Sequence, residues 1–293
     1  MRHLRVDGRA GSRQPWTGRG ALGRGILAVA VVAVLAGCAQ LQNIGAEGLM
    51  NIGASALPIG PEKEGEIGFG IAATVAGRYP LVEDRELLRY VNLVGQAVAQ
   101  QSIRYGEVPF RFGVLDTEDV NAFAAPGGYI FVTRGALELM ETEAALAGVL
   151  AHEVAHVDQK HVLDEIRRSS LMSSVQEESQ LDGAILDQIA ELGGSMLFMG
   201  LSREDEMESD SIGVLYAVAT GYQAAGLVQF LESLVAAEEV EGEPSEGMQE
   251  WLATHPSTAE RLEVLRAQLE TAGIDPQEGR AVADRFRRYV GGS

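Results

Sequence analysis

The stretch GVLAHEVAHVDQKHVL, residues 148–163, decides the fold. It carries three of the chain's five histidines, His152, His156 and His161, and Glu153 directly follows the first of them. An HExxH spacing on a helix places two imidazoles one turn apart on one face, where both can bind a single Zn²⁺. The glutamate is then placed to take a proton from an attacking water. Because this pentapeptide also occurs by chance, its surroundings decide how much it means.

The residues around the motif predict a long, buried helix. The pattern of apolar residues is helical from about residue 142 to residue 166. If that helix continues past residue 160, His161 lies about 180° around the axis from His152, at about 100° per residue. We therefore expect His161 to face away from the metal, as a structural or surface residue. A third protein ligand must come from another part of the chain.

A second acidic stretch, SREDEMESD at residues 202–210, offers that ligand. Glu206 and Asp210 are four residues apart, on one face of a predicted helix. One interpretation is a carboxylate ligand followed one turn later by a carboxylate that orients a ligand histidine. The other is a solvated acidic face, which is how we interpret Glu204 and Glu208. The residues alone leave both interpretations open for Glu206 and Asp210.

The N-terminus has the features of an export signal. Arginines precede the 12-residue apolar run ILAVAVVAVLAG, which is too short to cross a bilayer and fits the core of a signal peptide. The run ends at LAGC, and Cys38 is the chain's one cysteine. We predict a lipoprotein signal peptide over residues 1–37 and lipidation of Cys38. The alternatives are an ordinary signal with a chance cysteine and an uncleaved anchor.

Charge excludes some partners. The net charge is −19, and it becomes −24 once residues 1–37 are removed, with 17 basic and 41 acidic residues left. Nucleic-acid binding needs a basic face and is not expected. An anionic bilayer would also repel the chain, so membrane attachment must come from acyl chains. With one cysteine, the protein has no disulfide of its own.

The rest of the chain predicts an α+β fold that is mainly helical. Residues 38–61 are rich in Gly and Ala and are interpreted as a tether, and residues 62–293 as the folded domain. Two short runs, 110–115 and 128–133, are β-like and are joined by the predicted connection DTEDVNAFAAPG. Residues 167–200 are expected to form a mobile flap. No apolar run after residue 38 reaches 18 residues, so no further membrane span is expected.

Four motifs, in this order, resemble the HtpX and CAAX-prenyl-protease type of zinc metallopeptidase. They are NAFAAPGGYIFVTRGAL, LAGVLAHEVAHVDQKH, SREDEMESDSIG and THPSTAERL. The resemblance is to the soluble periplasmic lipoprotein branch. Some members of that branch carry a C-terminal array of TPR repeats. Too few residues follow the last motif for such an array, so partner binding through TPRs is not expected.

The resemblance implies a gluzincin site with one Zn²⁺. His152, His156 and Glu206 would be the ligands, Glu153 the general base, and Asp210 the carboxylate that orients a ligand histidine.

The resemblance also implies how substrate is held. The run GGYIFVT would be an edge strand that binds an extended chain by strand addition, through Gly128, Tyr129, Ile130 and Phe131. His255 and Arg261 would lie near the metal. They would stabilise the oxyanion, or His255 would cap the zinc in a resting state. The alternative for His255 is a structural cap at the N-terminus of the helix that follows.

The expected function is therefore a zinc-dependent endopeptidase that hydrolyses misfolded or stalled envelope proteins. It would be lipid-anchored on the periplasmic face, at the outer membrane because Ala39 and not Asp follows the cysteine. Two rival hypotheses stay open. The first is a non-proteolytic chaperone or assembly factor for outer-membrane proteins. The second is a lipid-anchored binding module whose HExxH is accidental.

Overall fold

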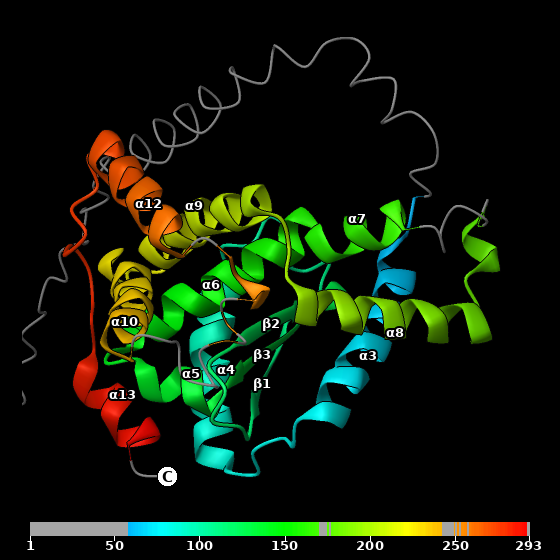
Figure 1. The fold of residues 1–293 in the computed structure, drawn as a ribbon, viewed down its shortest axis with the longest axis horizontal. Coiled ribbons are helices and arrows are strands. Elements are labelled where there is room, and N and C mark those ends of the chain that lie inside the picture. Colours follow the sequence, from blue (N-terminus) through cyan, green and yellow to red (C-terminus); the bar gives the residue numbers. More distant parts are fainter. Residues whose placement is uncertain are drawn as a thin grey trace, which may run out of the picture. The chain divides into compact units, whose positions relative to one another are not determined.

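The computed structural model describes residues 58–293 apart from 170–174, 176, 242–248, 250, 252, 257 and 292–293. The predicted signal peptide, Cys38 and the tether up to residue 57 lie outside the described residues. The fold is mainly helical with one small sheet, which confirms the predicted class (Figure 1). No single helix in the described part of the chain is both long and apolar enough to cross a membrane.

The elements follow one another along the chain as helices interrupted by a single sheet. They are α3 (Pro61–Arg78), α4 (Arg85–Ala99), β1 (Arg111–Leu115), β2 (Ala122–Ala125), the 3₁₀ turn η2 (Pro126–Gly128), β3 (Tyr129–Thr133), α5 (Arg134–Leu139), α6 (Glu143–Gln159), α7 (His161–Arg168), η4 (Glu178–Gln180), α8 (Gly183–Met199), α9 (Arg203–Ala219), α10 (Ala225–Glu241), α12 (Thr258–Ala272) and α13 (Ala283–Val290).

The sheet has the order β1-β3-β2, with β3 in the centre. β3 pairs in parallel with β1 and antiparallel with β2. The predicted edge strand over Gly128, Tyr129, Ile130 and Phe131 is therefore wrong, since this segment has a neighbour on each side. The missed strand is β2, inside the stretch predicted as a connection. Gly127 and Gly128, at φ values of 70° and 83°, make the turn between β2 and β3.

The two edges of the sheet differ in what covers them. Along the β1 edge, side-chain amides of α4 donate hydrogen bonds to backbone oxygens. Asn92 Nδ2 donates to Phe112 O at 2.7 Å, and Gln96 Nε2 donates to Phe110 O at 2.7 Å. β2 forms the opposite edge. The backbone oxygen of Asn121, the residue before β2, accepts a hydrogen bond from the backbone nitrogen of Thr133 in β3. Because the backbone groups of successive residues in a strand point to alternate sides, those of Ala122 and Ala124 point away from β3. The edge of the sheet without a neighbouring strand therefore lies along β2, whose residues are all buried.

The side chains of the sheet alternate between two apolar cores. One face, with residues such as Val114 and Ile130, packs in the larger cluster with α4, α6 and α10. The other face, with residues such as Phe123 and Phe131, packs in a second cluster with α3, α7 and α8. The two-residue period of a strand produces this division. Part of the predicted flap is thus α8, a helix that packs against α3.

Helix α6 lies between the sheet and α9 (Figure 1). Every residue of α6 except Gln159 is buried. Gly213 lets α9 come close, because a Cβ at that position would lie 2.8 Å from the backbone nitrogen of His152. That contact sets α9 directly against the first histidine of the HExxH motif, so the two motif-bearing helices are held in register.

A buried carboxylate ties the first residue of α6 to the surrounding elements. Glu143 accepts hydrogen bonds from Tyr90 OH at 3.0 Å and Tyr222 OH at 2.7 Å, and it pairs with Arg285 of α13. Burial raises the pKa of the Glu143 carboxyl, but the bonds from these three partners outweigh burial and hold its pKa below the ordinary 4.5. The carboxylate therefore stabilises the fold in its charged form.

We expect Glu143→Gln to lower the free energy of unfolding by about 1–3 kcal/mol near neutral pH, through loss of charged hydrogen bonds. A depressed pKa contributes stability that is complete above the pKa of the unfolded carboxyl and is lost as pH falls through that of the folded one. The difference between the two proteins should therefore shrink below about pH 4.5. Thermal unfolding of both proteins between about pH 7 and about pH 3 measures it, and a difference that did not change with pH would contradict this account.

Candidate metal centre

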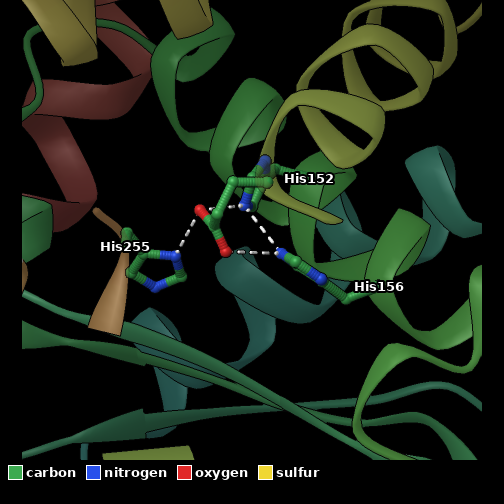
Figure 2. Close-up of side chains that lie close together, drawn as sticks. His152, His156 and His255 are labelled. Carbon is green, nitrogen blue, oxygen red and sulfur yellow. Dashed lines mark hydrogen bonds and ion pairs between the residues drawn. The ribbon is translucent and has the colours of Figure 1, made fainter. Parts of the chain in front are cut away.

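Three separate segments bring four side chains to one point. His152 and His156 come from α6, Glu206 from the first turns of α9, and His255 from the segment before α12. All four are buried. Figure 2 shows the three labelled imidazoles around a carboxylate, with their nitrogens turned toward it. One potential ligand atom from each residue lies within 4.8 Å of all the others, so the group can hold a metal ion.

The distances within this group fit one tetrahedral ion. His152 Nε2 lies 2.9 Å from His156 Nε2, 3.6 Å from Glu206 Oε2, and His156 Nε2 lies 3.4 Å from Glu206 Oε1. Neighbouring ligand atoms of a tetrahedral Zn²⁺, with bonds of about 2.0–2.1 Å, are about 3.3 Å apart. Two imidazole nitrogens and a carboxylate are also ligand types that zinc accepts.

The electrostatics of the histidine pair favour one positive charge and oppose a second. Burial acts to lower the pKa of His152, but the carboxylates of Asp210 and Glu206 raise that pKa to about 9. Burial and the charge of His152 lower the pKa of His156 to about 3. A bound cation supplies the favoured positive charge and leaves both imidazoles neutral, as metal binding requires.

Asp210 and Arg261 support the group from behind. Asp210 Oδ1 faces His152 Nδ1 at 2.9 Å, one turn beyond Glu206 on α9. The buried Arg261 donates to Asp210 through Nε and Nη2, at 2.8 and 2.7 Å, and its Nη1 lies 2.6 Å from Glu206 Oε2. Burial acts to raise the pKa of Asp210, but Arg261 and then His152 hold it at about 2. Burial acts to raise the pKa of Glu206 as well, but His255 and then Arg261 hold it well below its ordinary value.

Glu153 is buried and directly follows His152 on α6. Its Oε1 has no hydrogen-bond partner in the described part of the chain. Burial raises the pKa of this carboxyl above its ordinary value. A buried, unpaired carboxylate next to a metal-binding group is costly to keep and is suited to accept a proton.

His255 joins the group to the open strand β2. Its Nδ1 lies 2.9 Å from Glu206 Oε2 and its Nε2 lies 3.3 Å from the backbone oxygen of Ala122. Trp251 stacks on the imidazole, with ring centroids 4.1 Å apart. The neighbouring Thr254 donates to Asn121 Oδ1 at 3.1 Å. Nothing in the sequence pattern indicated that Trp251, Thr254 and Asn121 hold this ring.

His161 does not face away as expected. Helix α6 ends at Gln159, because Lys160 adopts the left-handed conformation with φ 61° and ψ 28°, and α7 begins at His161. The imidazole of His161 turns back, so that its Nδ1 lies 2.8 Å from His156 Nδ1. Glu208, which we interpreted as a solvated residue, lies 3.3 Å from His161 Nε2. The prediction of one continuous helix from about residue 142 to residue 166 is therefore wrong, because the helix is interrupted at Lys160.

The group is covered on its open side. A cavity of about 20 Å³ lies between Glu153, His156 and the Ala122–Ala124 segment. Leu197, Gly200 and Leu201, at and just after the end of α8, line it together with His255. A cavity of this size holds about one water molecule. Of the predicted substrate-binding residues Gly128, Tyr129, Ile130 and Phe131, none lines it.

Such an arrangement defines a metallopeptidase, because an HExxH helix adds an unpaired glutamate that a closed structural metal site does not have. Residues 87–269 match the family described as Peptidase family M48. That match covers more than half of the chain, and the chain belongs to this family.

Two similar proteins are a bacterial and a mitochondrial protease. The beta-barrel assembly-enhancing protease of Escherichia coli (strain K12) is 27% identical over 234 residues, which is 74% of this chain and 46% of the relative. The mitochondrial metalloendopeptidase OMA1 of Schizosaccharomyces pombe is 32% identical over 172 residues, 57% of this chain and 49% of the relative. The chain thus spans less than half the length of these relatives.

Proposed function

We propose that the protein is a zinc-dependent endopeptidase whose substrates are misfolded or stalled proteins of the bacterial envelope. The observation that carries the proposal is the meeting of His152, His156 and Glu206 beside the unpaired carboxylate of Glu153. Family membership and the named relatives agree with a peptidase. The name of the bacterial relative also connects that protease with β-barrel assembly.

The chemistry divides between an ion and the side chains. When bound by His152, His156 and Glu206, Zn²⁺ would polarise the scissile carbonyl and make the attacking water more acidic. Glu153 accepts the proton of that water and then gives it to the leaving amine. Its raised pKa makes the carboxylate a stronger base. His255 lines the cavity and is placed to donate an N–H to a developing oxyanion, whereas the guanidinium of Arg261 is bound to Asp210 and Glu206 and acts through them.

The open edge of β2 supplies a place for an extended substrate. The outward backbone groups of Ala124, and of Ala122 once its oxygen leaves His255 Nε2, can pair with a peptide by strand addition, and Glu153 and His156 line the same cavity. This replaces the edge-strand role that the sequence suggested for residues 128–131. Because the cavity holds about one water, the end of α8 must move before a polypeptide enters.

That cover also favours the second candidate, a chaperone or assembly factor that does not cleave its clients. A metal site beside so small a cavity is compatible with a protein that holds unfolded chains on another surface. Glu153 argues against this candidate, because a metal site that does not catalyse hydrolysis needs no general base.

For location, we propose the periplasmic face of the outer membrane, reached through a lipidated Cys38 after removal of residues 1–37. The support is the apolar run that ends in LAGC and the alanine that follows the cysteine. The same proposal assigns residues 38–61 as a tether and residues 62–293 as the peptidase domain.

The function is tested with the purified full-length chain and casein as an unfolded substrate. We expect about one zinc per chain and casein cleavage that a strong chelator abolishes and added Zn²⁺ restores. Zinc binding without any cleavage, even after prolonged incubation with unfolded substrate, would favour the chaperone. A chain without zinc would support an accidental HExxH and contradict the proposal.

A further inference from the structure

His156 has two nitrogens, and the structure places a different partner on each. Its Nε2 faces His152 and Glu206, as the dashed lines in Figure 2 show, and its Nδ1 faces His161 Nδ1 at 2.8 Å. His152, in contrast, has the carboxylate of Asp210 behind it. The second ligand histidine therefore has an imidazole where the first has an acid.

Metal binding determines which ring nitrogens of His156 and His161 carry a proton, because a ligand nitrogen must offer its lone pair to the metal. A ligand Nε2 must be unprotonated, so the proton of neutral His156 sits on Nδ1. His161 Nδ1 must then accept it and cannot carry a hydrogen. The buried hydroxyl of Ser209, 3.4 Å from the same Nδ1, is a second donor aimed at this lone pair. The proton of His161 is accordingly on Nε2.

Two acids of α9 face that Nε2. Glu208 Oε2 lies 3.3 Å from it and Asp205 Oδ1 lies 3.5 Å from it. The His161 side chain is 6% exposed and Glu208 is 54% exposed, so the chain of contacts runs from the buried group to the surface. The hydrogen bond from His161 lowers the pKa of Glu208, which keeps this acceptor charged.

We propose that His161 is a positioning residue for the metal, which fixes the Nδ1–H form and the ring orientation of His156 and is itself polarised by Glu208. The inference rests on the proposed function, since it concerns the same site. Lys160 makes it possible, because its left-handed backbone turns His161 back toward His156. Nothing in this arrangement brings His161 into contact with the substrate cavity.

The test measures the Kd for Zn²⁺ of the full-length chain by competition with a chromogenic chelator. We expect His161→Ala to weaken zinc binding about 10–100-fold, the usual effect of losing such a partner. His161→Asn should recover part of the loss, since an amide oxygen can accept from His156 Nδ1–H. Glu208→Gln should weaken binding in the wild-type chain and have no further effect on top of His161→Asn, because the link is already broken.

Glu204→Gln is the matched control, since Glu204 is an exposed acid on the same helix. Thermal unfolding of the zinc-free proteins separates positioning from simple packing. Unchanged zinc affinity in His161→Ala would overturn the proposal, as would equal losses in His161→Ala and His161→Asn. Failure of the proposed function would show differently, as a wild-type chain that binds no zinc or cleaves no casein.

Discussion

Glu153→Gln is expected to reduce casein cleavage by about 10²–10⁴-fold while the zinc content stays the same. Glutamine has the size of glutamate but cannot take a proton from water. Glu153 is buried, lies outside the group of potential ligands and has an unpaired Oε1, so its replacement removes a base and leaves the metal site intact. Initial rates of casein hydrolysis and zinc per chain, measured on the same preparation, give both quantities.

Glu204→Gln serves as the control for this variant. It makes the same chemical change at an exposed position of α9 and should leave the rate as it is. A Glu153→Gln protein that degraded casein as fast as the wild type would remove Glu153 from the mechanism and with it the peptidase chemistry drawn here.

Glu206→Ala is expected to have the largest effect on metal binding. It removes the anionic member of the group, and the change leaves Arg261 with one carboxylate partner in place of two. Loss of a residue that only orients a ligand weakens metal binding about 10–100-fold. Because Glu206 is itself a ligand, we expect its loss to lower the zinc affinity by more than that. Competition with a chelator measures the affinity, and hydrolysis should disappear in parallel.

The paired comparison is Glu204→Ala, which truncates an exposed glutamate two residues away. Thermal unfolding of both variants in excess chelator shows whether Glu206→Ala still folds. If Glu206→Ala folded and bound zinc as tightly as the wild type, another group would be the third ligand, and His255 would be the next candidate because its Nδ1 joins the same group.

Much of the site is predictable because it rests on helical spacing. His152 and His156 are separated by one turn, as are Glu206 and Asp210, and a four-residue period places each pair on one face. The structure brings the two pairs together through the close approach at Gly213. Sequence reasoning has no access to that contact and relied on a resemblance to bring Glu206 to the histidines.

Two of the errors concern local backbone geometry. Lys160 takes a left-handed conformation that non-glycine residues rarely adopt, so the spacing of a continuous helix misplaced His161. Ala122, Ala124 and Ala125 form a strand although alanine has no preference for one, since a buried position beside β3 decides their conformation. That strand displaced β3 from the edge, so the substrate-binding residues were assigned to the wrong strand.

The central claim is that His152, His156 and Glu206 hold one zinc ion. A crystal structure of the full-length chain grown with Zn²⁺, with anomalous scattering recorded on both sides of the zinc absorption edge, tests it most directly. The account predicts one strong anomalous peak in the domain, about 2.0–2.2 Å from His152 Nε2, His156 Nε2 and a carboxylate oxygen of Glu206. A zinc-saturated protein with no peak at this point, or with its peak on other side chains, would contradict it.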